Sequence, residues 1–323
     1  MDAPAVLYAL RWLIHDTFRQ TLSSRVFWIL LGLSLICIVF CLGVSVEGGA
    51  IIDEREIINP KTRQLIVETK EASGQTTLLF GLFRYQFTRK ASDEVQFLVS
   101  VFASWIAGTF GILMALVWTA GFVPDSLQPS AAAVLLAKPV PRWLFLAGKF
   151  LGVVCFIALH AAIFFVGTWL ALGLRTNHWQ VENLLAIPLM VFHFAVIFSF
   201  SVMLAVLFRS TMACVIGGVL FWIVCYAVNY GRHFAITYPD MPGFTVFLSE
   251  LGYWMLPKPA DFTIMLEQAL NLGASKDTLA AHDPFKTLLE KDLFHPIASI
   301  FTSCLFPAFA LWASASQLAK TDY

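Results

Sequence analysis

Few residues of this chain could carry out chemistry at membrane depth. His160 and His193 are the candidates for proton chemistry within the long apolar stretches of the sequence. A histidine in such a place can relay protons, but it is more often a neutral, hydrogen-bonded interior residue. The same stretches contain no Asp, Glu, Lys or Arg, whereas ion-coupled carriers commonly place such residues at membrane depth. The pattern therefore argues against transport by this chain that is driven by coupled ions or protons.

The cysteines and the sequence motifs give no indication of an enzyme, a metal site or a cofactor. Cys37 and Cys41 share a helix face, but they have no histidine or carboxylate neighbours, so packing is the better interpretation. The motifs His-Glu-x-x-His and Gly-x-Ser-x-Gly are absent. Gly148-Lys149 is a poor phosphate loop, because Trp143 and Phe150 replace residues that the motif requires. All six cysteines lie in apolar runs: Cys37, Cys41, Cys155, Cys214, Cys225 and Cys304.

Composition indicates an integral membrane protein. Of 323 residues, 59% are hydrophobic and 13% are charged, and the mean hydropathy is +0.75. These values lie outside the range of ordinary soluble domains. Lys plus Arg and Asp plus Glu both number 21, so nothing in the charge predicts a nucleic-acid partner. The lipid bilayer is the expected surrounding.

Uncharged runs long enough to cross the bilayer predict an all-α fold with six transmembrane helices. Both termini then lie on one side. The predicted segments are an interfacial helix at 1–25, TM1 at 26–46, an external loop at 47–96, TM2 at 97–123, a cytoplasmic loop at 124–149, TM3 at 150–174, a short external loop at 175–183, TM4 at 184–208, a cytoplasmic turn at 209–211, TM5 at 212–231, a long external or interfacial segment at 232–295, TM6 at 296–317 and a cytoplasmic tail at 318–323.

The segment before the first span has the pattern of an amphipathic helix in the membrane interface. Arg11, Asp16 and Arg19 interrupt it, so a cleaved signal peptide is not expected. The alternative is a cap helix that packs on protein. Its apolar face is formed by Leu7, Leu10, Leu13, Ile14 and Phe18.

Basic residues beside the short loops predict that both termini are cytoplasmic. With that orientation only Arg175 falls in the short external loop. The external loop contains the alternating pieces 64–69 and 76–88, which predict a small β-containing excursion. Within the long segment, residues 245–256 are aromatic and apolar, and we expect them to dip into or lie on the interface. The cytoplasmic side receives Arg11, Arg19, Arg25, Lys138, Arg142, Lys149, Arg209 and Lys320.

The loop between the second and third spans carries the most information. Pro129 suits the first turn of a helix and Pro139 disfavours helix at Lys138, which predicts a helix of about two turns on the cytoplasmic side. Lys138, Arg142 and Trp143 then form a basic exit at the membrane surface. Such a helix could transmit force to a docked partner, or the segment could be an ordinary linker.

The sequence resembles the permease subunits of ABC-2-type transporters, in the copper-processing and sodium-extrusion branch of bacterial permeases. The resemblance rests on Trp118-Thr-Ala-Gly-Phe-Val-Pro-Asp125, on Leu135-Leu-Ala-Lys-Pro-Val-Pro-Arg-Trp143, and on Gly148-Lys149. Ser210 and Thr211 after Arg209 are similar to the family's tight turn between spans four and five. The topology, with its amphipathic first helix and six spans, also agrees.

The resemblance implies a permease in the bacterial inner membrane, homodimeric or paired, that exports an unidentified substrate with two separate cytoplasmic ABC ATPase subunits. The chain itself would not be an enzyme and would need no cofactor. The alternatives are a secondary carrier, and a membrane scaffold or force-transmitting subunit without cargo. The residues that the resemblance assigns to ATPase coupling are Asp125, Ser126, Leu127, Gln128, Val134, Leu135, Leu136, Lys138 and Arg142.

Overall fold

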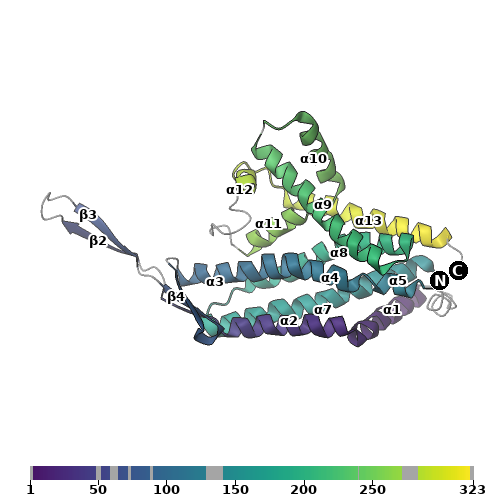
Figure 1. The fold of residues 1–323 in the computed structure, drawn as a ribbon, viewed down its shortest axis with the longest axis horizontal. Helices are drawn as coiled ribbons and strands as arrows, with labels where there is room; N and C mark the ends of the chain where they lie inside the picture. Colours follow the sequence, from purple (N-terminus) through teal and green to yellow (C-terminus); the bar gives the residue numbers. More distant parts are fainter. Residues whose placement is uncertain are drawn as a thin grey trace.

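The computed structural model describes residues 3–48, 52–58, 65–71, 74–87, 90–128, 141–238, 240–270 and 283–320, and all structural statements concern these residues. It is a helical bundle with a small β part at the end away from the termini (Figure 1). The predicted all-α membrane fold with six spans is confirmed. The segments long and apolar enough to cross a membrane are Arg25–Leu42, Ala91–Ser126, Arg142–Thr176, Val181–Phe208, Thr211–Thr237 and Pro296–Lys320.

Helices begin and end mostly where the sequence changes from apolar to polar residues. The spans are α2, then α3 to α5 with η2, then α7, then η3 with α8, then α9, and finally α13. The bounds are α1 Ala3–Ser23, α2 Arg25–Leu42, α3 Ala91–Ser100, η2 Val101–Gly111, α4 Ile112–Thr119, α5 Phe122–Ser126, α7 Arg142–Thr176, η3 Val181–Leu185, α8 Ala186–Phe208, α9 Thr211–Thr237, α10 Gly243–Met255, α11 Pro259–Ala269, α12 Asp283–Glu290 and α13 Pro296–Lys320.

Several spans extend beyond their expected bounds, among them the second, at Ala91–Ser126, and the sixth, at Pro296–Lys320. The third span begins at Arg142 and not at residue 150, because the helix starts directly after Pro141. The expected cytoplasmic loop 124–149 therefore ends earlier, and Lys149 lies inside α7. The fifth span continues past residue 231 to Thr237, so that it includes Arg232 and His233. Charged residues were taken as the ends of spans, although a helix can continue into polar sequence.

The second span contains a π-helical segment, η2, between α3 and α4. Thr109 Oγ1 donates a hydrogen bond over 3.2 Å to the carbonyl oxygen of Ser104, five residues earlier. A Cβ atom at Gly108 would lie 3.0 Å from the carbonyl oxygen of Ala103, so glycine permits this wide backbone turn. π-Helical turns are rare and often occur at functional sites.

The β part is built from the chain between the first and second spans. Strand β4 (Gly74–Leu78) pairs antiparallel with β1 (Ser45–Glu47) and with β5 (Phe83–Phe87), in the order β1-β4-β5. Ser45 pairs with Thr77, and Gly74 pairs with Phe87. A separate antiparallel hairpin joins β2 (Ile52–Ile58) to β3 (Leu65–Glu71). The predicted β-containing excursion is confirmed.

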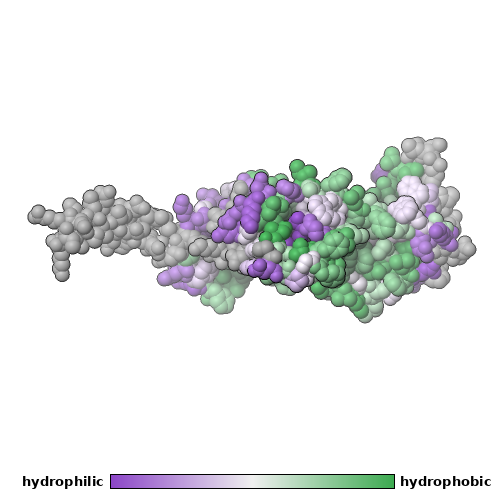
Figure 2. Space-filling view, turned by 90° about the horizontal axis from the view of Figure 1, so that it is seen from above, coloured by the Kyte–Doolittle hydropathy of each residue, from purple (hydrophilic) through white to green (hydrophobic). Residues whose placement is uncertain are grey.

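Aromatic packing joins the helices near the chain termini. Phe156 of α7 contacts Phe27 of α2 and Trp118 of α4, with ring centroids 5.2 and 5.3 Å apart. Away from the centre, the bundle exposes large apolar side chains, among them Trp28 and Phe301. Figure 2 shows apolar surface over much of the middle of one face, with hydrophilic side chains gathered towards both ends of the helical body. This distribution fits a bundle surrounded by lipid.

Candidate functional site

The predicted coupling segment is described only at its two ends. Val134, Leu135, Leu136 and Lys138 lie outside the described residues. At the first end, Leu127 is 1% exposed and belongs to the main hydrophobic core, while Ser126 Oγ donates a 2.7 Å hydrogen bond to the Phe122 carbonyl oxygen. Asp125 and Gln128 are exposed. Ser126 and Leu127 are therefore packed inside the bundle, whereas the side chains of Asp125 and Gln128 are exposed.

The second end of this segment is fixed by Arg142, the first residue of α7. Its Nη1 donates to the carbonyl oxygens of Leu318 and Ala319, at 2.8 and 3.2 Å. These carbonyls belong to the last turn of α13, where the helix has no partners of its own for them. The sequence placed Arg142 at a lipid surface. In the structure it ties the start of α7 to the end of α13.

Helix α1 packs closely on α7. Leu13 and Thr17 lie against Gly148 and Gly152, where added Cβ atoms would come within 2.6 and 2.8 Å of them. Gly148 and Gly152, four residues apart on α7, thus allow the two helices to pack closely. The predicted interfacial face is divided: Leu13 is buried on protein, Leu10, Ile14 and Phe18 are half-buried, and Leu7 is exposed.

A buried lysine reinforces this contact. Lys149 is fully buried, and its Nζ lies 3.0 Å from both Asp16 Oδ2 and Gln20 Oε1 of α1. A buried ammonium without an anionic partner would be costly, so Asp16 is needed once Lys149 is inside the bundle. Helix α1 therefore contacts α7 in two ways: Leu13 packs on the glycines of α7, and Asp16 and Gln20 bind Lys149. We define Asp16, Gln20 and Lys149 as the α1 clamp.

Gly152→Val should loosen α1 and lower the apparent melting temperature of the purified chain by several degrees. The reason is that the Thr17 Cβ, 2.8 Å from the new Cβ position, is close to the backbone and cannot rotate away. Thermal unfolding in detergent, followed by tryptophan fluorescence, measures the shift. Gly32→Val is the matched control, because nothing lies within 4 Å of its Cβ position. Equal melting temperatures for the two variants would contradict the packing described.

The two intramembrane histidines occupy separate places on either side of η2. His160 Nε2 lies 3.1 Å from Ser34 Oγ, and both residues line a cavity of about 100 Å³. His193 is 5% exposed and lines a smaller cavity of about 20 Å³. Among the described residues, His160 Nδ1 and His193 Nε2 are buried without a hydrogen-bond partner. The structure does not bring the two rings into one site.

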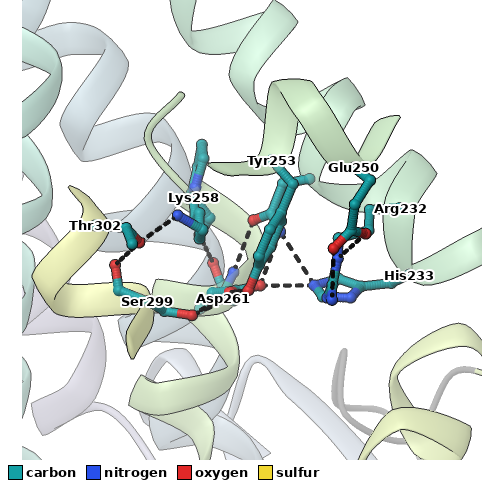
Figure 3. Close-up of polar contacts among 11 residues, drawn as sticks. Arg232, His233, Glu250, Tyr253, Lys258, Asp261, Ser299 and Thr302 are labelled. Atoms are coloured by element: carbon teal, nitrogen blue, oxygen red, sulfur yellow. Dashed lines mark hydrogen bonds and ion pairs between the residues drawn. The ribbon is translucent and has the colours of Figure 1, made fainter. Parts of the chain in front are cut away.

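A cluster of buried polar side chains lies where α9, α10, α11 and α13 meet (Figure 3). At its centre is Asp261, in the first turn of α11 and fully buried. Its Oδ1 accepts from His233 Nε2 and Asn229 Nδ2 at 2.6 and 2.8 Å. Its Oδ2 accepts from Ser299 Oγ and Tyr253 Oη at 2.6 and 2.8 Å. We name these five residues the outer network.

Hydrogen bonding keeps the carboxylate of Asp261 charged. Burial by itself would raise the pKa of Asp261, but the hydrogen bonds from His233, Ser299 and Asn229 outweigh burial and leave this pKa lowered. A carboxylate only accepts hydrogen bonds, so His233 carries its hydrogen on Nε2. The position of Asp261 at the start of α11 also favours negative charge.

Two cations flank Tyr253 beside the outer network, and Figure 3 shows its ring between them. The Arg232 guanidinium lies 4.0 Å from the ring centroid and pairs with Glu250 at 2.8 Å. Lys258 Nζ lies 4.6 Å from the same centroid. Burial lowers the pKa of Lys258 to about 8, although the Asp261 charge opposes this shift. The arrangement holds four helices together around one carboxylate.

A comparison with protein-family models decides the classification. Residues 11–237 match the model described as "ABC-2 family transporter protein". The chain belongs to the ABC-2 family. The comparison with curated proteins finds no match. The match confirms the resemblance to ABC-2-type permeases, while the branch suggested by the sequence stays a prediction.

Membership of the ABC-2 family identifies the chain as a membrane component of an ABC transporter, and this family associates with ABC ATPases. The matched residues include α2 to α9, the α1 clamp, both histidines and the segment between α5 and α7. They also include Asn229 and His233 of the outer network. Tyr253, Asp261 and Ser299 lie beyond residue 237, so the outer network of this ABC-2 permease joins matched and unmatched parts of the chain.

Sequence reasoning missed the outer network, although it left some signals. Asn229 and His233 are four residues apart and lie on one helix face once α9 continues past residue 231. Pro259 at a helix start, followed by Asp261, is the usual pattern of a helix N-terminus. Neither signal shows that this face of α9 contacts the start of α11. The turn expected at 209–211 is present, because Arg209 adopts a left-handed conformation and Ser210 caps α9.

Proposed function

We propose that this chain is the membrane-spanning subunit of an ABC exporter, powered by a separate cytoplasmic ATPase. The observation that carries the proposal is the family match over residues 11–237. The chain lies in the inner membrane with both termini in the cytoplasm, and it works as a homodimer or with a second permease. The ATPase docks at the end of the bundle that carries both termini.

The anchoring of the coupling segment supports this role. Its first end is held by Leu127 in the hydrophobic core, and its second end by Arg142 on the last turn of α13. Figure 1 shows α5, the end of α13 and both termini at the same end of the molecule. A push on the segment would therefore reach the second, third and sixth spans together. This is the rigid-body coupling that an ATP-driven closure requires.

The α1 clamp extends the same connection. Lys149 lies two helical turns after Arg142 on α7 and joins that helix to Asp16 and Gln20 of α1. Because α7 is one continuous helix from Arg142 to Thr176, movement at its start is passed to α1 and along the third span. We infer that the four residues Val134, Leu135, Leu136 and Lys138 provide the contact with the ATPase, and that Asp125 and Gln128 contribute to it.

Cysteine accessibility tests the orientation and the docking site together. On a background without the six native cysteines, Ser130→Cys should react with a membrane-impermeant maleimide only in inside-out vesicles, and a bound ATPase should slow the reaction at least about tenfold. His178→Cys, in the loop after α7, is the control and should react only in right-side-out vesicles. Labelling of position 130 from outside would overturn the orientation, and unchanged labelling with the ATPase bound would overturn the docking site.

A further inference from the structure

The turn between β4 and β5 exposes a group of large apolar side chains. The turn consists of η1, at Leu79–Gly81, and of Leu82, which follows it. Phe80, Leu82 and Phe83 are 68, 79 and 62% exposed. Large apolar side chains exposed together commonly mark contact with a membrane or with another protein. We name these three residues the apolar tip.

The direction of the strands brings the apolar tip back to the end of α2. β1 leaves that end of the helix, and β4 runs antiparallel to β1, with Gln75 opposite Glu47 and Thr77 opposite Ser45. β4 therefore returns towards α2. The turn that follows it lies at the level where the helix ends.

The end of α2 lies at the surface of the bilayer. The helix has 18 residues and begins at Arg25, so it is about 27 Å long and only just crosses a hydrocarbon core of about 30 Å. Gly43 follows its last residue, and its carbonyl oxygen accepts a 3.0 Å hydrogen bond from the Phe80 N–H. The apolar tip is therefore held at the boundary between hydrocarbon and lipid headgroups.

The polarity of the three-stranded sheet changes along its strands. The end away from α2 exposes the polar side chains of Glu47, Gln75 and Gln86, whereas the end beside α2 exposes the apolar tip. A soluble partner could bind either end. A lipid surface explains why the apolar side chains lie at the end that is nearest to the first span.

The backbone of the turn is strained. Leu79 and Phe80 have φ values of 50 and 57°, in the left-handed region that residues with a Cβ atom avoid, and Gly81 follows with a φ of 99°. Two successive left-handed residues with side chains cost free energy, and strain of this kind is found mainly at functional positions. Transfer of the Phe80 ring from water to the membrane interface would offset this cost.

A basic side chain lies beside the same turn. Nη2 of Arg84 is 4.0 Å from the position that a Cβ atom on Gly81 would take. Arg84 is exposed, and no carboxylate pairs with it among the residues that the structure describes. A guanidinium group can donate two parallel hydrogen bonds to a phosphate. The turn thus combines apolar side chains with a group that fits a lipid phosphate.

We propose that the apolar tip and Arg84 bind phospholipid and anchor the β part to the leaflet at the end of the bundle away from the termini. Phe80, Leu82 and Phe83 enter the lipid just below the phosphates, and the Arg84 guanidinium binds a phosphate. The contact requires the six spans but no ATPase and no particular orientation. It therefore does not rest on the proposed function.

Spin labelling of the full-length chain in phospholipid nanodiscs tests the contact. A nitroxide on Leu82→Cys, in a background without the native cysteines, should be more accessible to oxygen than to a water-soluble nickel chelate, because oxygen concentrates in the bilayer. Ile36→Cys is the lipid reference, since Ile36 is 65% exposed within the first span. Gln86→Cys is the aqueous reference on the same sheet. The ratio of the two accessibilities at position 82 should lie well above that at position 86 and towards that at position 36.

Cross-linking of the unmodified chain gives a second result that depends on no variant. Phosphatidylglycerol with a diazirine near the carboxyl end of one acyl chain should form adducts on the apolar tip and none on Gln75 or Gln86, as located by mass spectrometry. Arg84→Gln should lower the yield of these adducts about fivefold, the effect of one basic residue at an anionic lipid surface.

Three outcomes would contradict the proposal. Equal access of the nickel chelate to positions 82 and 86 would place the apolar tip in water. Protection of position 82 from both reagents, without lipid adducts, would mean that a second copy or another protein covers it. An unchanged adduct yield in Arg84→Gln would show that this residue binds no lipid phosphate.

Discussion

Asp261→Asn should lower the stability of the purified chain by about 3–5 kcal/mol, the usual cost of removing one partner from a buried charged group. The carboxylate of Asp261 accepts hydrogen bonds on both oxygens from four side chains. An asparagine keeps one accepting oxygen, and its NH₂ group would face donors such as Tyr253 and Ser299. At least one buried donor would then be unpaired, which adds to the cost.

The matched control is Glu250→Gln, which removes a charge beside the outer network and not inside it. Glu250 pairs with Arg232, but its side chain is 45% exposed, and such pairs contribute about 0–1 kcal/mol. Urea or thermal unfolding in detergent, with the two variants and the unmodified chain side by side, gives the ranking. If both variants lose the same small amount, Asp261 does not hold the four helices together.

The same network predicts how stability depends on pH. The pKa of Asp261 is lowered in the folded chain, so its stabilising contribution is complete above the unfolded pKa of about 3.9. It is lost as the pH falls through the lowered folded pKa. The network should therefore stay intact at neutral pH and fail only in strong acid.

Leu135→Asp should separate this permease from its ATPase. The residue is placed by our proposal in a packed contact, where an unpaired charge costs about 2–4 kcal/mol, or at least about 30-fold in affinity. The measurement is the yield of ATPase that copurifies with the tagged chain, after expression and membrane insertion have been shown to be normal. ATP hydrolysis by any remaining complex should be uncoupled from transport.

The double variant Lys138→Ala and Arg142→Ala should reduce copurification less. Basic residues near anionic lipid contribute about 1 kcal/mol each, and Arg142 is engaged by the carbonyl oxygens of α13. Its loss should therefore appear mainly as lower thermal stability. If Leu135→Asp leaves the copurification yield and ATP hydrolysis unchanged, the segment is a linker and the coupling role belongs elsewhere.

The sequence predicts the membrane fold well, because length and hydropathy decide which segments cross a bilayer. Gly148 and Gly152, which the structure places against α1, have the four-residue spacing of small residues that favours close helix packing. The helix that packs against these glycines was not predictable, because nothing in the residues around Gly152 indicates that Thr17 of α1 contacts it. Lys149 was assigned to a loop because the third span was taken as the uncharged run that begins at residue 150. Its partner, Asp16, is distant in sequence.

The outer network shows a second limit. Asp261 follows Asn229 by 32 residues, and most of the stretch between them belongs to the segment that was predicted to be external or interfacial. Its burial depends on four helices that converge: α11 carries Asp261, and α9, α10 and α13 contribute the donors, each unremarkable by itself. Helical periodicity describes one face of one helix, so a site made by several helices needs tertiary information.

The most direct test of the central claim is to purify the tagged chain from the membranes of its own cells and to assay the purified material for ATP hydrolysis. We predict a stoichiometric partner with a Gly-x-x-x-x-Gly-Lys-Ser/Thr motif, and hydrolysis by the complex but neither binding nor hydrolysis of ATP by the isolated chain. Transport of a cargo by the chain alone, without ATP and without any such partner, would contradict the account.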